Sequence, residues 1–310
     1  MLRTRTVIAI VAMAVMVSSV VGFALMSANS HTSEPALVAA PPSGSPTHYG
    51  HPSISSGTLS HASAIALSCP LSSTQCYESL NWGGYVVYNS SYSVTKVTGT
   101  WTVPTIAGST STTCPDAQMT WDSNSVWIGI DGAFTSTVEQ TGTSSDCFYG
   151  MTSYYAWYEF YPAGSVVVPI TVSPGDQMTA SVIYTGNNVA GNPTFKTTIT
   201  DVTTGNSVTS PKTAVPGALR ESAEWIDESP YYYGFLGLTH VTPVKFSAAT
   251  ATIGGVTHPI GGWPATNVYW FVMVDYNFPY ASTITYVKAE PGALNSAGNV
   301  FSVTWVSDGP

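Results

Sequence analysis

The stretch Ser222-Ala223-Glu224-Trp225-Ile226-Asp227-Glu228 alternates between side chains of different chemical kinds. Successive side chains of a β-strand point to opposite faces, so Glu224 and Ile226 would share one face and Trp225 would lie on the other. An alternating run with aromatic and β-branched residues is typical of a strand whose two faces differ. We therefore predict a strand here, and the rest of the chain indicates which kind of sheet it joins.

This strand is also rich in acid. The chain has 17 acidic residues, and four of them lie in or beside the strand, at Glu221, Glu224, Asp227 and Glu228. A carboxyl group among apolar and aromatic side chains loses hydration, which raises its pKa and suits it to acid–base catalysis. An exposed acidic strand end would have the same composition, so this stretch alone leaves both interpretations open.

Further strands are predicted from Asn81 onward, where runs rich in Val, Ile, Thr, Tyr and Trp alternate with turn residues. The clearest are Gly84–Tyr88, Val97–Val103, Val126–Ile130, Tyr154–Tyr161, Val166–Val172, Gln177–Tyr184, Thr194–Val202, Val268–Val274 and Val300–Val306. Turn signals such as Pro174-Gly175-Asp176 separate them, and no stretch has the period of an amphipathic helix. The pattern indicates an all-β fold, an antiparallel β-sandwich or jelly roll of two sheets.

The N-terminal part has a different character. Residues 1–30 have the form of a signal peptide, with Arg3 and Arg5 ahead of the uncharged apolar run Val7 to Met26. The run is about as long as the roughly 20 residues that cross a bilayer, so an uncleaved membrane anchor is the alternative. Residues 31–78 lack any sustained period and are interpreted as a propeptide or linker. The folded domain would then be residues 79–310, secreted or membrane-anchored outside the cytoplasm.

The low content of charged residues limits the classes of function that the chain could have. Charged residues make up only 8% of the chain, with eight Lys and Arg in total and a pI near 4.9. This composition argues against nucleic-acid binding, because phosphate contacts need clustered basic residues. When carboxylates protonate at low pH, few positive charges remain to repel one another, so the composition suits an acidic environment. Secreted β proteins rich in Ser and Thr can share this composition.

The four cysteines favour disulfides over a metal site. They lack a Cys-x-x-Cys pair and have no His at metal-ligand spacing. An even number of cysteines in an exported protein is typical of disulfide pairing. We favour Cys69 with Cys76 and Cys114 with Cys147, one of three pairings that the sequence allows. No metal or other cofactor is expected.

Three other strands carry polar groups that could take part in chemistry. Trp127 and Asp131 would share one face of their strand, and the Gln140 amide could donate a hydrogen bond to an oxyanion. On the strand Tyr154 to Tyr161, Trp157 and Glu159 share a face that could bind an extended polymer. These residues also have structural interpretations. Asp131 could cap a turn, Gln140 could hydrogen-bond to buried backbone groups, and the aromatic residues could pack in the core.

Taken together and in order, these motifs resemble the glutamic peptidases, also called eqolisins. The matching segments are Asn81-Trp82-Gly83-Gly84-Tyr85, Val97 to Pro104, Trp127-Ile128-Gly129-Ile130-Asp131-Gly132, Gln140-Thr141-Gly142, Ala156 to Pro162 and Ala223-Glu224-Trp225-Ile226. The resemblance covers about residues 80–306. It implies a sandwich of two curved antiparallel sheets, concanavalin-like, which agrees with the fold predicted from the strand pattern.

The resemblance also implies a catalytic Gln/Glu pair, which falls on Gln140 and Glu224, and a propeptide, which agrees with residues 31–78. Four more positions are implied to line or support the active cleft: Trp127, Asp131, Trp157 and Glu159. The remaining acids of the first strand, Glu221, Asp227 and Glu228, are expected to be solvated or to support a loop. Glu139 directly precedes Gln140, and alternation should point it away from the cleft.

The implied activity is that of a secreted acid endopeptidase. Glu224 would take a proton from the attacking water and Gln140 would stabilise the oxyanion, with no covalent intermediate. An unperturbed Glu, with a pKa of about 4.3, would suit acid conditions. We expect protein or peptide substrates, a monomer, and no stable membrane contact unless the N-terminal segment stays uncleaved. Two alternatives remain: a jelly-roll glycoside hydrolase that pairs Glu224 with Glu159, and a non-catalytic β-sandwich binding module.

Overall fold

A computed structural model of the chain describes residues 75–115, 120–232, 234–276 and 284–308. The chain divides into two units, residues 1–37 and 38–310, and all the described residues belong to the second. The predicted signal segment and most of the predicted propeptide lie outside the described residues. None of the helices in the described ranges has the length and apolar character needed to cross a bilayer.

The described residues form eighteen strands and two short 3-10 turns. The strands are β1 (Cys76–Ser79), β2 (Trp82–Tyr88), β3 (Val94–Thr102), β4 (Trp121–Ile130), β5 (Val138–Phe148), β6 (Met151–Tyr161), β7 (Val166–Thr171), β8 (Gln177–Asn187), β9 (Pro193–Asp201), β10 (Ser207–Thr209), β11 (Thr213–Ala214), β12 (Ser222–Glu228), β13 (Gly237–Leu238), β14 (Val244–Ile253), β15 (Val256–Pro259), β16 (Val268–Tyr276), β17 (Ile284–Pro291) and β18 (Phe301–Trp305). The 3-10 turns are η2 (Ile260–Gly262) and η3 (Ala265–Asn267). The predicted boundary between residues 78 and 79 falls inside β1.

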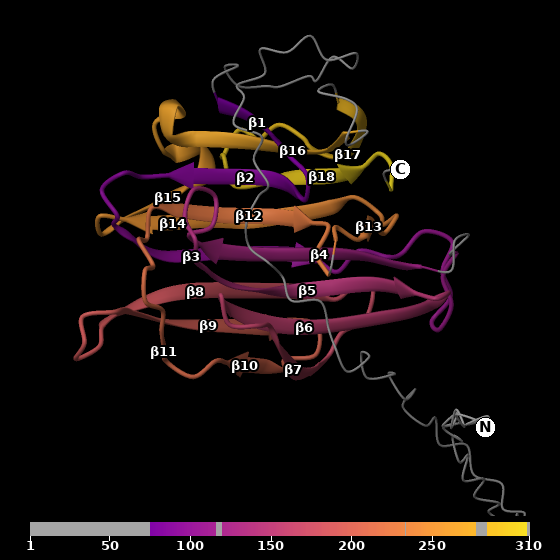
Figure 1. Ribbon diagram of the computed structural model, residues 1–310, viewed down its shortest axis with the longest axis horizontal. Helices are drawn as coiled ribbons and strands as arrows, with labels where there is room; N and C mark the ends of the chain where they lie inside the picture. The colour runs from indigo at the N-terminus through magenta and orange to yellow at the C-terminus, as the bar shows by residue number, and fades with distance from the viewer. Residues whose placement is uncertain (1–74, 116–119, 233, 277–283, 309–310) are drawn as a thin grey trace, which may run out of the picture. The chain divides into compact units, whose positions relative to one another are not determined.

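Strand pairing arranges these elements in two layers. The first has the order β1, β16, β2, β12, β4, β5, β6, β7, and in Figure 1 the indigo β2 lies beside the orange β12. The second has the order β17, β18, β14, β3, β8, β9, with β10 and β11 both paired to β9. The layers join at one edge, where β16 pairs with β17. Only β1–β16 and β13–β4 are parallel among the strand pairs of the described residues, so the predicted antiparallel sandwich is confirmed.

The main hydrophobic core lies between the two layers. Trp225 of β12 and Ile128 of β4 are fully buried there. The Trp225 Nε1–H donates to the backbone oxygen of Thr98 in β3 at 2.8 Å, which ties one layer to the other. A Cβ at Gly99 would lie 2.9 Å from Ile128 Cγ2, so glycine allows the layers to approach closely here. Burial of each large apolar side chain contributes roughly 1.5–3 kcal/mol.

The first layer is also buried on its other face. A second cluster there contains Trp82, Trp127, Trp157, Ile226 and Phe271. The rings of Trp82 and Trp127 meet edge to face, with centroids 4.8 Å apart. The sequence predicted one polar and one apolar face, but β12 has no exposed residue on either face. The polar residues of this second face are therefore buried with the aromatic ones, and the candidate site lies among them.

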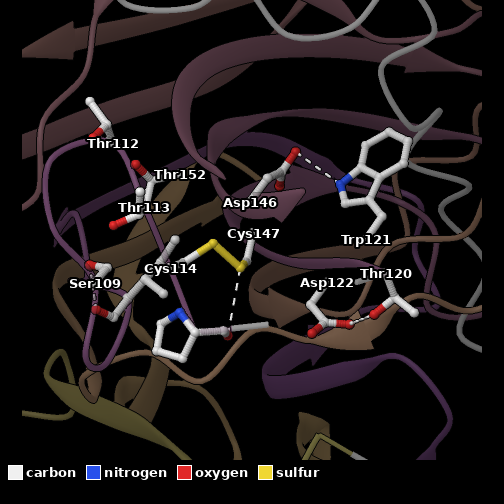
Figure 2. Close-up of a disulfide and its surroundings, with 12 residues drawn as sticks. Ser109, Thr112, Thr113, Cys114, Thr120, Trp121, Asp122, Asp146, Cys147 and Thr152 are labelled. Atoms are coloured by element: carbon white, nitrogen blue, oxygen red, sulfur yellow. Dashed lines mark hydrogen bonds between the residues drawn. A yellow bond between two sulfur atoms is a disulfide. The ribbon is translucent and has the colours of Figure 1, made fainter. Parts of the chain in front are cut away.

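One predicted disulfide is confirmed. Cys114, in the loop after β3, is bonded to Cys147 near the end of β5 (Figure 2). Closing a loop between residues 33 positions apart stabilises the fold by about 3–4 kcal/mol in the chain-entropy model. Cys76 is also disulfide-bonded. Its predicted partner Cys69 lies outside the described residues, so that pairing stays a prediction.

Candidate active site

Four adjacent strands place the predicted catalytic pair in one row across the first layer. Glu224 of β12 pairs with Gly129 of β4, Gly129 with Gln140 of β5, and Gln140 with Glu159 of β6. Directly paired residues point to the same face, so the three polar side chains share a face with a glycine between the first two. Two strand spacings of about 4.8 Å separate Glu224 from Gln140, or about 10 Å between their Cα atoms.

Gly129 keeps the space between the pair free of side-chain atoms. A Cβ at this position would lie 2.9 Å from Cζ3 of the Trp127 ring and 3.4 Å from Cβ of Gln140. The first of these distances is too short for any real Cβ, so a larger residue would displace the ring. Gly129 and the Trp127 ring together form the surface between Glu224 and Gln140.

Gln140 is held from its other side by Glu159. The amide Nε2–H of Gln140 donates to Oε2 of Glu159 at 2.7 Å, and both side chains are fully buried. Among the described residues, neither Gln140 Oε1 nor Glu159 Oε1 has a hydrogen-bond partner. Burial raises the pKa of Glu159 well above its ordinary value, and the nearby Glu228 raises it further. The amide is thus oriented by one hydrogen bond, with a second N–H left to donate.

Glu224 is enclosed to the same extent. It has 0% of its surface exposed, and neither carboxyl oxygen makes a hydrogen bond of good geometry to a described group. Burial raises its pKa well above the ordinary value, while Ser222 and the Ala133 N–H act in the opposite direction. The expectation of an unperturbed Glu is therefore wrong for the full-length chain, in which this carboxyl group is protonated under acid conditions.

Asp131 supports the strand that carries Glu224. Its carboxylate accepts the backbone N–H groups of Leu219, Arg220 and Glu221 at 2.8, 2.7 and 2.8 Å. It sits in the left-handed backbone region, with φ of 66°, at the end of β4. Burial raises its pKa, and these three hydrogen bonds lower it. Both oxygens of Asp131 are occupied by the turn that leads into β12, so the group positions that strand.

Trp127 and Trp157 lie in the next row, two residues along each strand from the row of the predicted catalytic pair. Trp127 pairs with Gly142, which pairs with Trp157. A Cβ at Gly142 would lie 2.5 Å from Cβ of Trp127, so glycine is required between the two indoles. The Trp157 Nε1–H donates to Ser144 Oγ at 3.0 Å. The two indoles thus flank the row of Glu224 and Gln140 on the same face.

Comparison with known proteins identifies the family. The family model described as the peptidase A4 family matches residues 80–274. The chain belongs to the peptidase A4 family. The resemblance to the glutamic peptidases is thereby confirmed.

Two curated relatives support the assignment. Aspergillopepsin-2 of Aspergillus niger is 36% identical over 195 residues, which cover 58% of this chain and 66% of that protein. Scytalidopepsin B of Scytalidium lignicola is 34% identical over 152 residues, which cover 48% of this chain and 51% of that protein. The matched part therefore spans between half and two thirds of the length of these relatives.

Solved structures of the family show the same fold. A scytalido-glutamic peptidase with a transition state analog inhibitor matches with a TM-score of 0.56 and 24% identity, over 73% of this chain and 98% of that chain. SCP-B, an eqolisin in complex with the tripeptide Ala-Ile-His, matches with a TM-score of 0.54, 24% identity and the same coverage. The two-layer β-sandwich is thus a fold that glutamic peptidases have.

The other acids in and beside β12 are not solvated in this A4 domain. Glu221, Asp227 and Glu228 were expected to be solvated or loop-supporting, and all three are buried. Glu228 accepts Trp127 Nε1–H at 2.7 Å and Asn81 Nδ2–H at 3.1 Å, and burial raises its pKa to about 8. Burial likewise raises the pKa of Asp227 to about 7. The sequence contained one signal that Glu228 belongs to the candidate site: alternation places its side chain on the same face of the strand as Glu224.

Glu139 lies on the opposite face, as alternation predicts. It pairs with Ile130, which faces the core between the layers. It is fully buried, and neither of its oxygens has a hydrogen bond of good geometry to a described group. Burial raises its pKa well above the ordinary value, and Asp131 raises it further. Glu139 is therefore a neutral core residue at acid pH, separate from the pair in the candidate site.

Proposed function

We propose that this chain is the precursor of a secreted glutamic endopeptidase that hydrolyses proteins and peptides under acid conditions. The observation that carries the proposal is the row Glu224–Gly129–Gln140, which sets a carboxyl group and an amide on either side of a glycine. Membership of the peptidase A4 family supports the same reaction. Peptide-based and tripeptide ligands bound to solved relatives support peptides as the substrate class.

In the proposed reaction, a water molecule lies between Glu224 and Gln140, above Gly129. The Glu224 carboxylate takes a proton from this water as the water oxygen attacks the scissile carbonyl carbon. The free N–H of the Gln140 amide donates to the oxyanion of the tetrahedral intermediate. The amine then leaves with the proton held by Glu224, which regenerates the carboxylate and releases a carboxylic acid and an amine.

The full-length chain is a resting form in this proposal. Glu224 and Gln140 are both 0% exposed, so a polypeptide has no path to them. A protonated Glu224 is also too weakly basic to take a proton from water. We propose that the chain becomes active on losing its propeptide, residues 31–78 or part of them. A solvated Glu224 has a pKa near the ordinary value, at which it works as a base in acid.

The arrangement fits a paired-carboxylate glycosidase poorly. Glu224 and Glu159 are separated by three strand spacings, which place their Cα atoms about 14 Å apart. The carboxyl groups of glycosidases lie about 5–5.5 Å or 6.5–9.5 Å apart. Gln140 lies between the two acids and occupies one oxygen of Glu159. A carboxyl–amide pair explains this geometry better than two carboxylates do.

The proposal is tested by acid activation of the purified full-length chain. We expect acid incubation to shorten the chain at its N-terminus and to produce cleavage of an unfolded protein substrate. N-terminal sequencing of the product would locate the boundary, and a Glu224→Gln chain treated in parallel shows whether the chain cleaves itself. A shortened, folded product that cleaves no protein substrate at any pH between about 2 and 7 would rule the proposal out.

Glu159 is expected to act as a positioning residue for Gln140. Glu159→Ala removes the acceptor that orients the amide, so we expect kcat to fall by about 10- to 100-fold with a smaller change in KM. Glu159→Gln retains an acceptor oxygen at the same place and should recover most of this loss. Steady-state kinetics on one peptide substrate would separate kcat from KM. Equal kcat values for wild type and Glu159→Ala would contradict the role.

A further inference from the structure

Glu228 lies on the face of the candidate site, but the proposed reaction does not use it. It follows Glu224 along β12, and it pairs with Ser125 of β4 and Trp82 of β2. A strand rises about 3.4 Å per residue, so the Cα atoms of Glu228 and Glu224 lie about 14 Å apart. At that distance Glu228 can influence the reaction only through a side chain that lies between them.

The Trp127 indole is such a side chain. Oε2 of Glu228 accepts the Nε1–H of Trp127 at 2.7 Å, and both side chains are 0% exposed. Cζ3, at the opposite end of the same indole, approaches Gly129 so closely that a Cβ there would lie 2.9 Å from it. The indole therefore connects Glu228 to the surface between Glu224 and Gln140.

Three contacts hold this indole in place. Glu228 accepts its N–H, Gly129 lies against Cζ3, and the Trp82 ring meets it edge to face, with centroids 4.8 Å apart and planes inclined by 76°. The hydrogen bond is the directional contact among the three. An indole without it could tilt, and Cζ3 would then move relative to Gly129. A displacement of about 1 Å near reacting groups can lower a rate about 100-fold.

Glu228 is itself fixed at both of its oxygens. Its Oε1 accepts the Nδ2–H of Asn81 at 3.1 Å, and Oδ1 of Asn81 accepts the Oγ–H of Ser79 at 3.3 Å. Asn81 and Ser79 are buried as fully as Glu228. The two donors to Glu228 come from different parts of the chain, Asn81 just before β2 and Trp127 in β4. A side chain locked in this way can hold another group in position.

The charge state of Glu228 suits this role in acid. Burial raises its pKa to about 8, so its carboxyl group is neutral under acid conditions. Its ionised form would disturb the site, because Glu228 raises the pKa of Glu159, the residue that orients Gln140. A neutral carboxyl group accepts the indole N–H and adds no charge. Glutamine has nearly the same shape and also has an acceptor oxygen.

We propose that Glu228 is a positioning residue of the peptidase: it fixes the Trp127 indole against Gly129 and so shapes the place of the attacking water between Glu224 and Gln140. Glu228 touches neither the water nor the peptide, and it acts through Trp127. The inference rests on the proposed function, because the water and the peptide belong to that reaction.

Steady-state kinetics of acid-processed protein test the role. Glu228→Leu removes the acceptor, so kcat should fall by about 10- to 100-fold with a smaller change in KM. Glu228→Met fills the space with only a weak acceptor and replaces that variant if Glu228→Leu does not fold. Glu228→Gln should recover most of the loss. Asp227→Asn changes the neighbouring acid on the opposite face and should keep kcat within a few-fold of wild type.

A double-mutant cycle separates this role from general damage. Trp127→Phe keeps a ring but removes the N–H donor, so it should also lower kcat. If Glu228 acts through Trp127, the variant with Glu228→Leu and Trp127→Phe should be no slower than the slower single variant. Losses that multiply in the double variant would overturn the inference, as would equal kcat values for wild type and Glu228→Leu.

The indole N–H also gives a readout that needs no activity. In proton–nitrogen correlation spectra of the full-length chain, the peak that Trp127→Phe removes belongs to Trp127. This peak should move in Glu228→Leu and move less in Glu228→Gln, and a peak unmoved in Glu228→Leu would overturn the inference. A processed wild type that cleaves nothing contradicts the proposed function, and with it this role, even where the Trp127 peak moves as expected.

Discussion

Gln140→Ala is expected to reduce the kcat of the processed enzyme by about 100- to 1,000-fold, the effect of removing one donor to an oxyanion. Glu224→Gln is expected to reduce it by about 100- to 10,000-fold, because a general base is lost. The physical reason is their shared row, in which only Gly129 lies between the two side chains. Single-turnover rates on one peptide substrate, measured on acid-processed protein, would give both values.

Glu139→Gln provides the matched control for this pair. Glu139 is adjacent to Gln140 in sequence and fully buried, but it points into the core between the layers. Because burial keeps its carboxyl group protonated in acid, Gln is close to an isostere and kcat should stay within a few-fold of wild type. A paired-carboxylate glycosidase would retain much of its activity in Gln140→Ala. Substantial peptide cleavage by Gln140→Ala would therefore contradict the carboxyl–amide mechanism.

The full-length chain is expected to lose stability as the pH rises from acid to neutral. Burial raises the pKa of Asp146 to about 6, of Asp227 to about 7 and of Glu228 to about 8. The ordinary values are 3.8 for Asp and 4.5 for Glu. Between its ordinary and its raised pKa, each group is protonated in the folded chain and ionised in the unfolded chain. Urea unfolding at about pH 3, 5 and 7 would measure the trend.

The sign follows from proton binding. The unfolded chain binds fewer protons than the folded chain in this window, so the free energy of unfolding falls with rising pH. Stability is complete below about pH 4 and is lost as the pH passes through about 6, 7 and 8. Each group alone weakens the fold by about 1.4 kcal/mol per pH unit inside its window. Together they remove several kcal/mol, a large share of the roughly 5–15 kcal/mol that a domain has.

Lys288 changes the free energy of unfolding in the opposite direction, and it does so at higher pH. Burial lowers its pKa from 10.5 to about 8, so its contribution to stability increases only above about pH 8. Asp227→Asn and Glu228→Gln provide the specific test, because each side chain imitates the protonated acid. Each variant should resemble wild type in acid and exceed it near neutral pH. A wild-type stability that rises between about pH 3 and 7 would contradict the assignment.

The sequence by itself determined most of the strands. The predicted run Gln177–Tyr184 lies within β8, and the run Val166–Val172 nearly coincides with β7. In each run apolar and polar side chains alternate, which is the pattern of a strand that is buried on one face. β14 (Val244–Ile253) and β17 (Ile284–Pro291) were not predicted, although both pair along the second layer. Many of the β14 residues are small Ala, Ser and Thr, which give a weak alternating signal.

The order of short motifs also identified Gln140 and Glu224 as the candidate pair, but not the geometry between them. That geometry depends on the register of β12, β4 and β5, which brings residues more than eighty positions apart into one row. Register is a property of paired strands, because each strand alone has the same alternation in any pairing. The row with Glu159, and the glycine that keeps it open, therefore emerged only in the folded chain.

Burial was decided by the tertiary structure alone. Alternation placed Glu224 and Glu228 on one face and Asp227 on the other, and the sequence predicted that Asp227 and Glu228 would be solvated or would support a loop. All three are buried, and both faces of the first layer carry clusters of buried residues. A strand determines where its side chains point, whereas whether that direction leads to water depends on what packs against the sheet. The raised pKa values of these acids follow from that packing.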